Sequence, residues 1–225
     1  MPEAFDPGAP GSSADGVFGL PYSEAQARLV YLPVPWEATT SYGAGASNGP
    51  SAIRRASAQV DLFDFDVLRP YEPGLFMRDE PSQVKAWNKT AKTAAQKVIR
   101  ALESGKKPDL RALGTVNNLG SKLNDWVYEQ TKALYAAGKI PAVVGGDHST
   151  PQGAIKAASE RHPSLGLLHF DAHHDTRRAY EGFTFSHASI FYNVLNDCPG
   201  VGKLVQVGIR DFSQAERLFC LSQGD

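Results

Sequence analysis

Short runs of apolar residues alternate along this chain with longer segments in which apolar side chains recur every three or four positions. The continuous runs lie at 27–32, 140–144, 165–170 and 204–209, and the helical periodicity lies at 83–103, 119–137 and 154–161. Unbroken apolar runs of this length, separated by helices, are typical of parallel strands that are buried on both faces. The pattern therefore predicts an α/β fold with three layers, α/β/α, around a mainly parallel sheet.

The first residues of the chain are mostly of types that bury little apolar surface on folding. Residues 1–22 are rich in Gly, Pro, Ser and Ala, which predicts a flexible N-terminal arm. We expect a single domain over 23–225. Within it, a Gly-rich loop at 41–49 precedes Pro50 at the start of a short helix, and 104–115 has the Gly, Lys and Pro content of a loop.

Polar residues directly follow two of the predicted strands. The run at 140–144 is followed by GGDHS at 145–149, and the run at 165–170 is followed by DAHHD at 171–175. In open parallel sheets, the ligand site lies at the carboxyl ends of the strands. We therefore expect these two clusters to form the functional site together.

Three residues of the second cluster have alternate spacing. Asp171, His173 and Asp175 stand at i, i+2 and i+4, so their side chains point the same way if the chain stays extended past the strand. Two carboxylates and an imidazole suit Mn²⁺, and less specifically Zn²⁺, Ni²⁺ or Fe²⁺. His148, in the first cluster, is expected to add another ligand. A lone Asp-x-His motif more often caps a turn, but the combination with GGDHS favours a metal site.

Two further histidines lie close to this predicted site. His169 has the same parity as Asp171 but lies inside the strand, where we expect a buried, hydrogen-bonded histidine that orients a ligand. His174 has the opposite parity and is expected to face away from the metal.

Composition and charge give no reason to expect some classes of binding partner. Lys and Arg total 23 against 24 for Asp and Glu, so the formal net charge is −1 and nothing favours nucleic acid or an anionic membrane as a partner. Cys198 and Cys220 are too few for a disulfide framework. No apolar run approaches the roughly 20 residues that span a bilayer, and no signal-peptide pattern is present. These features predict a cytoplasmic protein.

The polar clusters also carry a family resemblance. GGDHS at 145–149 and DAHHD at 171–175 resemble the first two metal-binding signatures of the ureohydrolase family, which includes arginase, agmatinase, guanidinobutyrase and formimidoylglutamase. Residues 48–54 resemble the GPxAIR stretch of that family, and 207–210 resemble its later strand. The resemblance covers about 27–213 and implies an arginase-like fold.

The resemblance implies a role for each matching residue of the metal site. His148 and Asp175 would ligate the first of two Mn²⁺ ions, His173 would ligate the second, and Asp171 would bridge both. A hydroxide between the metals would attack the guanidinium carbon of a small guanidino substrate, releasing urea and an amine. The resemblance also implies a homo-oligomer, a trimer or hexamer.

The resemblance further implies residues that act on the substrate. His187 resembles the histidine that passes a proton to the leaving amine, and Asp147 would be a second-shell or substrate-facing carboxylate. Asp211 and Ser213 lie near the position where arginases bind the substrate α-amino group. Because Ser213 is uncharged, agmatine, guanidinobutyrate or guanidine is favoured over arginine. Arg177 and Arg178 either recognise an acidic substrate tail or form a solvated loop pair.

One family signature is not found in the sequence. The third metal-binding motif, Asp-x-Asp, is expected beyond residue 213, and 212–225 does not contain it. Asp171 and Asp175 bring two negative charges against four positive charges of two divalent ions, which predicts one bound metal rather than a stable pair. We therefore expect 23–225 to be a partial domain that lacks its C-terminal portion. The alternatives are a truncated, non-catalytic member that acts as a metal-binding or oligomerisation partner, and a zinc deacetylase with a related sheet.

Overall fold

The computed structural model describes residues 16–40 and 42–224. Its strands are β1 (Leu29–Val34), β2 (Leu75–Met77), β3 (Ile140–Gly145), β4 (Leu165–Phe170) and β5 (Val201–Val207). Every pairing between them is parallel, in a sheet of order β2-β1-β3 and a separate pair β4-β5. The predicted α/β class with parallel strands is confirmed.

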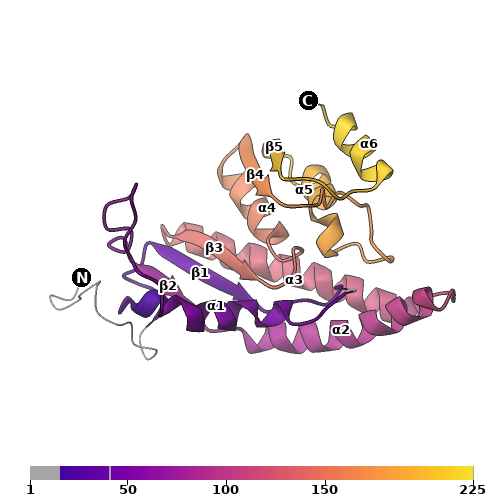
Figure 1. Cartoon of the computed structure of the whole chain (residues 1–225), viewed down its shortest axis with the longest axis horizontal. Helices are drawn as coiled ribbons and strands as arrows, with labels where there is room; N and C mark the ends of the chain where they lie inside the picture. The colour runs from indigo at the N-terminus through magenta and orange to yellow at the C-terminus, as the bar shows by residue number, and fades with distance from the viewer. Residues whose placement is uncertain (1–15, 41, 225) are drawn as a thin grey trace.

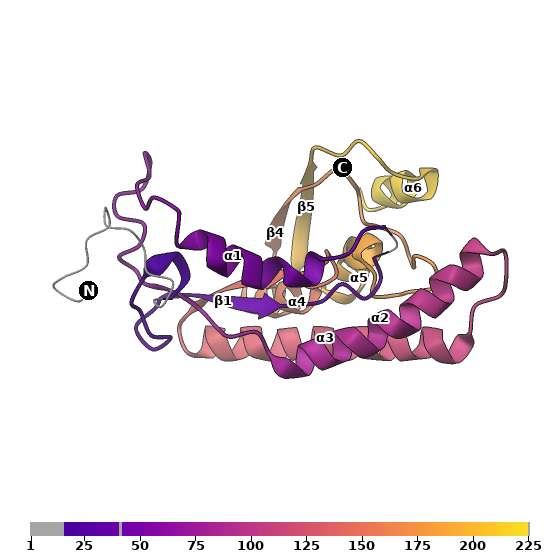
Figure 2. The same cartoon turned by 60° about the horizontal axis from the view of Figure 1, so that its bottom comes forward.

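Helices surround these strands. They are α1 (Gly49–Ser57), α2 (Ser82–Glu103), α3 (Leu110–Ala136), α4 (Gln152–Arg161), α5 (Ile190–Asp197) and α6 (Gln214–Ser222), with short 3-10 helices η1 (Val17–Gly19), η2 (Ala46–Asn48) and η3 (His187–Ser189). In Figure 2, α1 lies on the opposite side of β1 from α2 and α3, which gives the layered arrangement that the pattern predicted. Among the described helices, none combines the length and apolar character needed to cross a bilayer.

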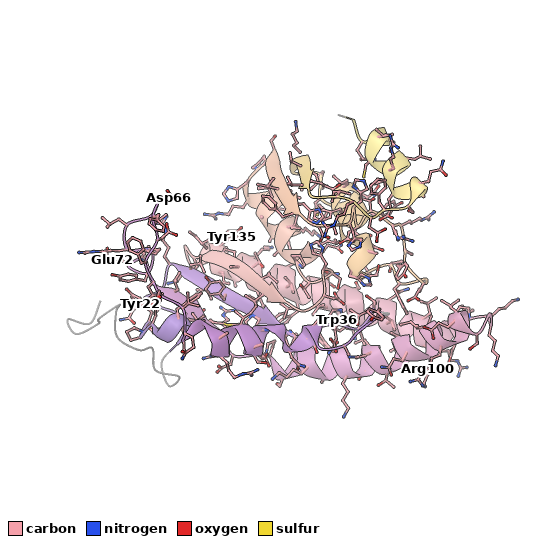
Figure 3. The ribbon with its side chains drawn as sticks, in the orientation of Figure 1. Tyr22, Trp36, Asp66, Glu72, Arg100 and Tyr135 are labelled. Carbon is pink, nitrogen blue, oxygen red and sulfur yellow. The ribbon has the colours of Figure 1, made fainter. Side chains whose placement is uncertain are left out.

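The main core lies between β1 and the two long helices. Leu32, Val34 and Trp36 are buried there against α2 and α3. Trp36 follows the end of β1 and lies close to both long helices (Figure 3). Since Trp36 has an exposed fraction of 0%, it anchors the backbone from which the loop to α1 departs.

Helix α3 begins earlier than the apolar periodicity predicted. The sequence indicated a loop over 104–115 and a helix from 119, whereas α3 starts at Leu110. The Asp109 side chain accepts hydrogen bonds from the backbone N–H groups of Arg111 (2.9 Å) and Ala112 (3.2 Å), which satisfies donors that a helix start leaves free. This cap offsets the poor helix propensity of Gly114.

The Asp109 cap can be tested by substitution. We expect Asp109→Ala to lower the free energy of unfolding by about 1 kcal/mol, because two backbone donors at the start of α3 lose their acceptor. Asp109→Asn should retain most of the stability, since Asn also caps helices well. Urea unfolding followed by circular dichroism measures both variants. Equal losses for Ala and Asn would contradict a capping role.

The sequence pattern did not predict β2, and it predicted the ends of two other strands at positions that differ from those in the structure by two or three residues. β2 has only three residues, too few for any periodicity to show, and it pairs with β1 through Leu29 opposite Leu75. β5 begins at 201 rather than 204, and β1 spans 29–34 rather than 27–32. Boundaries depend on pairing with a neighbouring strand, which a single apolar run does not reveal.

The predicted N-terminal arm is only partly covered by the description. Residues 1–15 of the arm lie outside the described residues. The remainder of the predicted arm contains η1, in which Val17 is buried, and Leu20 just after it has an exposed fraction of 0%. Within the described residues, 17–20 are therefore part of the folded region, because these two apolar side chains are buried.

One face of the β4-β5 pair is not covered by the described residues. The other face packs on α4 and α5 through Leu167 and Leu204. On the open face, the register places Leu168 opposite Val205 and Phe170 opposite Val207, and Leu168 and Phe170 have exposed fractions of 63% and 71%. The prediction of strands covered on both faces therefore does not hold for this pair in residues 16–40 and 42–224. Figure 1 shows the pair set apart from the three-stranded sheet.

Candidate metal centre

The two polar clusters predicted at the strand ends meet in space. Nδ1 of His148, in the turn after β3, lies 2.7 Å from Asp175 Oδ2 and 3.2 Å from Asp171 Oδ2. Asp171 follows the last residue of β4 directly, so both strands deliver these side chains from their carboxyl ends. The expected convergence of His148, Asp171 and Asp175 is what the structure shows.

Glycines shape the turn that carries His148. A Cβ atom on Gly146 would lie 2.4 Å from Trp36 O and 2.7 Å from Val34 O, and its φ of +73° also favours glycine. The N–H of Asp147 donates to Trp36 O at 2.8 Å. The GG pair of GGDHS therefore lets this turn approach the end of β1 closely, and the main chain around His148 is held against the core.

Nδ1 of His148 faces two carboxylates, those of Asp175 and Asp171. Burial alone would lower the pKa of His148, but the hydrogen bond to Asp175 and the nearby charges of Asp175 and Asp171 outweigh it and raise the pKa above its ordinary value. The two carboxylates therefore favour the protonated form of His148. A metal ligand must be unprotonated, so a cation at this position would compete with a proton.

Asp171 is held from two sides. Its Oδ1 accepts the backbone N–H of His173 at 3.0 Å, and its Oδ2 faces Nδ1 of His148 and Nε2 of His169, the latter at 3.3 Å. Burial would raise the pKa of Asp171, but these partners lower it below its usual value. Asp171 is therefore an ionised carboxylate, the state that a cation requires.

Asp175 reaches the site through a turn and not through an extended strand. Its backbone φ is +52°, a left-handed conformation that Asp tolerates better than most residues. Its carbonyl accepts the N–H of Phe191 at 3.0 Å, and its side chain is buried. The predicted convergence of Asp175 with Asp171 and His148 is present, but it arises from a turn, because the chain does not stay extended past Phe170.

For the same reason, His173 takes a different place from the one predicted. Its side chain is 54% exposed, with Nδ1 3.4 Å from Asp171 Oδ1 and Nε2 3.4 Å from Asp211 Oδ2. His173 therefore lies at the rim and not among the converging ligand atoms. The role of His173 as a ligand stays a prediction.

His169 occupies the inner position instead. The atoms of His148, His169, Asp171 and Asp175 that could ligate a metal all lie within 4.8 Å of one another. Nε2 of His169 is buried and has no hydrogen-bond partner among the described residues, although it lies 3.3 Å from Asp171 Oδ2. The Phe191 ring packs against the His169 ring with centroids 4.2 Å apart. As predicted, His169 is buried beside a candidate ligand.

Asp147 points into the interior beside the site. Its Oδ1 accepts hydrogen bonds from the backbone N–H (2.9 Å) and hydroxyl (2.5 Å) of Ser149, and its Oδ2 is buried without a partner among the described residues. Burial raises the pKa of Asp147. This carboxyl shapes the turn before His148, and it is not one of the clustered ligand atoms.

These side chains fit a divalent cation. The carboxylate oxygens of Asp171 and Asp175 and Nδ1 of His148 converge within reach of one another. Asp171 and Asp175 supply two negative charges, which balance one divalent ion. The donor set mixes oxygen and nitrogen, as expected for Mn²⁺ and less specifically for Zn²⁺ or Ni²⁺.

A cavity of about 220 Å³ opens beside these ligand atoms. It is lined by His173, Asp175, Arg177, Tyr180, His187, Ala188, Asp211, Phe212 and Glu216. His187, in η3, lies with Nδ1 3.4 Å from Thr39 Oγ1. Four of these residues belong to the loop and short helix at 176–190. His187 and Asp211 thus share one cavity with Asp175.

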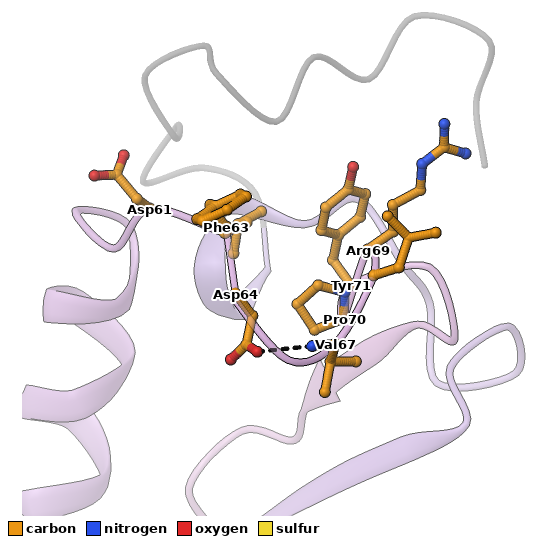
Figure 4. A pocket seen from close by; sticks show the side chains of 9 residues that line it. Asp61, Phe63, Asp64, Val67, Arg69, Pro70 and Tyr71 are labelled. Atoms are coloured by element: carbon orange, nitrogen blue, oxygen red, sulfur yellow. Dashed lines mark hydrogen bonds between the residues drawn. The ribbon is translucent and has the colours of Figure 1, made fainter.

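A second cavity lies in the loop between α1 and β2. It measures about 460 Å³ and is lined by Asp61, Leu62, Phe63, Asp64, Val67, Leu68, Arg69, Pro70 and Tyr71. Figure 4 shows this hollow and the hydrogen bond from the Val67 N–H to Asp64 Oδ1, 2.9 Å long. Its walls are mostly apolar and contain no histidine, so it does not share the chemistry of the first cavity.

Glu216 was not identified from the sequence as part of the site. It is buried at the cavity wall, where its Oε2 accepts hydrogen bonds from the Ser213 N–H and hydroxyl and lies 3.3 Å from Arg177 Nε. The spacing S-x-x-E is the capping-box signal that could have located it. Ser213 is therefore engaged in capping α6, and Arg177 is paired with Glu216 and lies over the Tyr180 ring. Arg177 is 41% exposed and lines the cavity, so its role toward an acidic substrate tail stays a prediction.

Comparisons with known proteins identify the family of this chain. The family model described as "Arginase family" matches residues 27–224. The N(1)-aminopropylagmatine ureohydrolase of Thermus thermophilus is 32% identical over 198 residues, covering 86% of this chain and 55% of that protein. An agmatinase of Bacillus anthracis is 27% identical over 195 residues, covering 87% of this chain and 56% of that protein. The chain spans about half the length of these curated relatives.

Solved structures show the same fold. The arginase from Medicago truncatula is 26% identical, with a TM-score of 0.63, and the match covers 88% of this chain and 55% of that one. A putative agmatinase from Clostridium difficile is 20% identical, with a TM-score of 0.63, over 89% of this chain and 61% of that one. The second likeness, at this identity, is one of fold alone.

Proposed function

The chain belongs to the arginase family, and from that premise we propose that it carries the metal-binding part of a centre that hydrolyses a guanidino compound. The observation that carries the proposal is the convergence of His148, Asp171 and Asp175. The chain spans about half the length of its curated relatives, so its catalytic activity is also part of this proposal.

In this proposal, His148, Asp171 and Asp175 hold a divalent ion. Mn²⁺ is preferred, on the donor set and the family resemblance, with Ni²⁺ and Zn²⁺ less favoured. Such an ion supplies Lewis acidity, which makes water nucleophilic near neutral pH. The Asp171 carboxylate faces the side chains of His148 and His169 and accepts a hydrogen bond from the backbone N–H of His173. Its orientation is therefore fixed before any cation binds. The charge balance favours one ion on these residues.

The cavity residues would act on the substrate. Hydrolysis adds water across a C–N bond, so the departing amine must gain a proton. His187 lies in the cavity wall with Asp175, which supports a role as the group that supplies this proton. Asp211, whose side chain is 81% exposed at the rim, can attract a cationic guanidino substrate. The His173 side chain lies between the carboxylates of Asp211 and Asp171. A change in the position of Asp211 at the rim would therefore affect Asp171 at the metal site.

Other predictions stay open. A cytoplasmic location and a trimeric or hexameric assembly stay predictions, and so does the preference for agmatine, guanidinobutyrate or guanidine over arginine. The zinc deacetylase alternative is replaced by the family assignment. The alternative of a non-catalytic, metal-binding member remains in competition, because two carboxylates balance only one divalent ion.

A metal titration tests the proposal. We expect the chain to bind one Mn²⁺ saturably, as followed by the loss of free Mn²⁺ signal in electron paramagnetic resonance. The double variant His148→Ala, Asp175→Asn should lose this binding, because one imidazole and one carboxylate are removed. Absence of saturable binding by the unchanged chain, or equal binding by the double variant, would end the proposal.

Urea release separates the two functional readings. The Mn²⁺-loaded chain is assayed with agmatine, guanidinobutyrate, guanidine and arginine. Urea from one of the first three, lost in His187→Ala without loss of Mn²⁺ binding, supports the catalytic reading. Metal binding without urea from any of them supports the non-catalytic reading. A clear preference for arginine would contradict the predicted substrate class.

A further inference from the structure

Gln206, next to the last residue of β5, contacts two histidines, one in β4 and one in the polar cluster after β4. Its Nε2 lies 2.9 Å from His169 Nδ1 and 3.0 Å from the carbonyl oxygen of His174, and its Oε1 lies 2.6 Å from His174 Nδ1. The strand register places Gln206 directly opposite His169. We propose that Gln206 is a positioning residue that fixes the tautomer of His169, so that its Nε2 presents a proton to Asp171 Oδ2 and not a lone pair to a metal.

The orientation of the Gln206 amide follows from its contact with His174. A backbone carbonyl oxygen can only accept a hydrogen bond, so the amide atom beside it must be the NH₂ nitrogen. The amide oxygen then faces Nδ1 of His174 and accepts its proton. The reversed amide would bring two oxygens together at 3.0 Å. His174 therefore sets the direction in which Gln206 donates.

The tautomer of His169 follows from that direction. The two N–H groups of the amide are directed at His174 O and at His169 Nδ1. An N–H donor cannot face a second N–H, so Nδ1 carries the lone pair and the ring proton lies on Nε2. Nε2 is the atom that faces Asp171 Oδ2 at 3.3 Å. His169 thus presents a proton, not a lone pair, to the candidate centre.

This assignment changes the set of ligands. Geometry alone admits four groups, because His169 Nε2 lies within the 4.8 Å cluster. A protonated Nε2 cannot bind a cation, which leaves His148, Asp171 and Asp175 and gives His169 the task of directing the Asp171 carboxylate. The ring of Phe191, 4.2 Å away, holds the His169 ring in this orientation. The exclusion of His169 from the metal ligands rests on the proposed function, whereas the assignment of the His169 tautomer does not.

Nitrogen NMR tests the tautomer directly. The chain has six histidines, so ¹⁵N-histidine labelling gives a spectrum simple enough to assign with single variants such as His169→Gln. Two-bond proton–nitrogen correlations distinguish a protonated Nε2 from a protonated Nδ1. We expect His169 to carry its proton on Nε2 in the unchanged, metal-free chain. A proton on Nδ1 overturns the proposal.

Two substitutions test the part played by Gln206. Gln206→Glu offers a carboxylate that accepts a proton from Nδ1, so the ring proton of His169 should move from Nε2 to Nδ1. Gln206→Met removes the donor at similar size, and Mn²⁺ affinity should fall by about 10- to 100-fold, the usual effect of losing a group that orients a ligand. An unchanged His169 tautomer in Gln206→Glu overturns the proposal. If either variant unfolds by circular dichroism, the spectrum of the unchanged chain decides alone.

A matched control separates positioning from general stability. Gln130 accepts a hydrogen bond from Arg78 at 2.8 Å, away from the histidines. Gln130→Met should leave the His169 signals and the Mn²⁺ affinity unchanged, whatever it costs in stability. If the unchanged chain shows the expected tautomer but binds no Mn²⁺, the proposed function fails and the role of Gln206 in the tautomer stands. If it binds Mn²⁺ with the proton on Nδ1, the reverse holds.

Discussion

Replacing Asp171 by Asn should weaken Mn²⁺ binding by about 100-fold or more, beyond the 10- to 100-fold expected for a group that only orients a ligand. Asp171 is one of two carboxylates among the clustered atoms, so the substitution removes half of their negative charge. The amide would also place a donor where His148 and His169 now face an oxygen. The geometry of the site changes little, because Asn has the same shape.

Electron paramagnetic resonance of free Mn²⁺ measures this loss, with circular dichroism as a check on folding. Asp197→Asn is the control, since Asp197 is an exposed carboxylate at the end of α5 and outside the cluster. It should change the affinity by about fivefold at most, as expected for a screened surface charge, for which about 1 kcal/mol is an upper value. Equal losses in the two variants would show that the chain binds Mn²⁺ through its overall charge.

Replacing Gly153 by Ala should destabilise the fold by about 1–3 kcal/mol, the usual range for an overpacked interior. Helix propensity alone predicts the opposite, a gain of up to about 1 kcal/mol, because Gly153 lies in α4. The added Cβ would lie 2.2 Å from Asn124 O and 2.7 Å from Tyr128 N, both backbone atoms of α3. Backbone cannot move aside as a side chain does, so α4 would have to shift away from α3.

Gly114→Ala is the matched control for this prediction. Gly114 is also a helical glycine, in α3, and a Cβ there would meet no other atom within 4 Å. It should raise the free energy of unfolding by about 0.5–1 kcal/mol, since the unfolded chain loses freedom. Urea unfolding of both variants is the measurement. A stabilised Gly153→Ala variant would mean that α3 and α4 are not packed as closely as described.

Local sequence determined much of this protein. The apolar runs located β3 and β4 well, and the helical periodicity located α2, since both signals depend only on neighbouring residues. GGDHS and DAHHD identified His148, Asp171 and Asp175, because the carboxyl ends of parallel strands are where ligand groups gather. His169 was recognised as a buried histidine from its place inside a strand.

Only the tertiary structure decided which of these side chains meet. The turn after Phe170 leaves the His173 side chain exposed at the rim of the site, and no spacing rule describes a turn set by the hydrogen bond between Phe191 and Asp175. Gln206 lies far along the chain from His169, yet strand pairing places them opposite each other. The proton position on His169 depends on that contact. The chemistry of the residues is thus local, whereas their partners depend on contacts between distant segments.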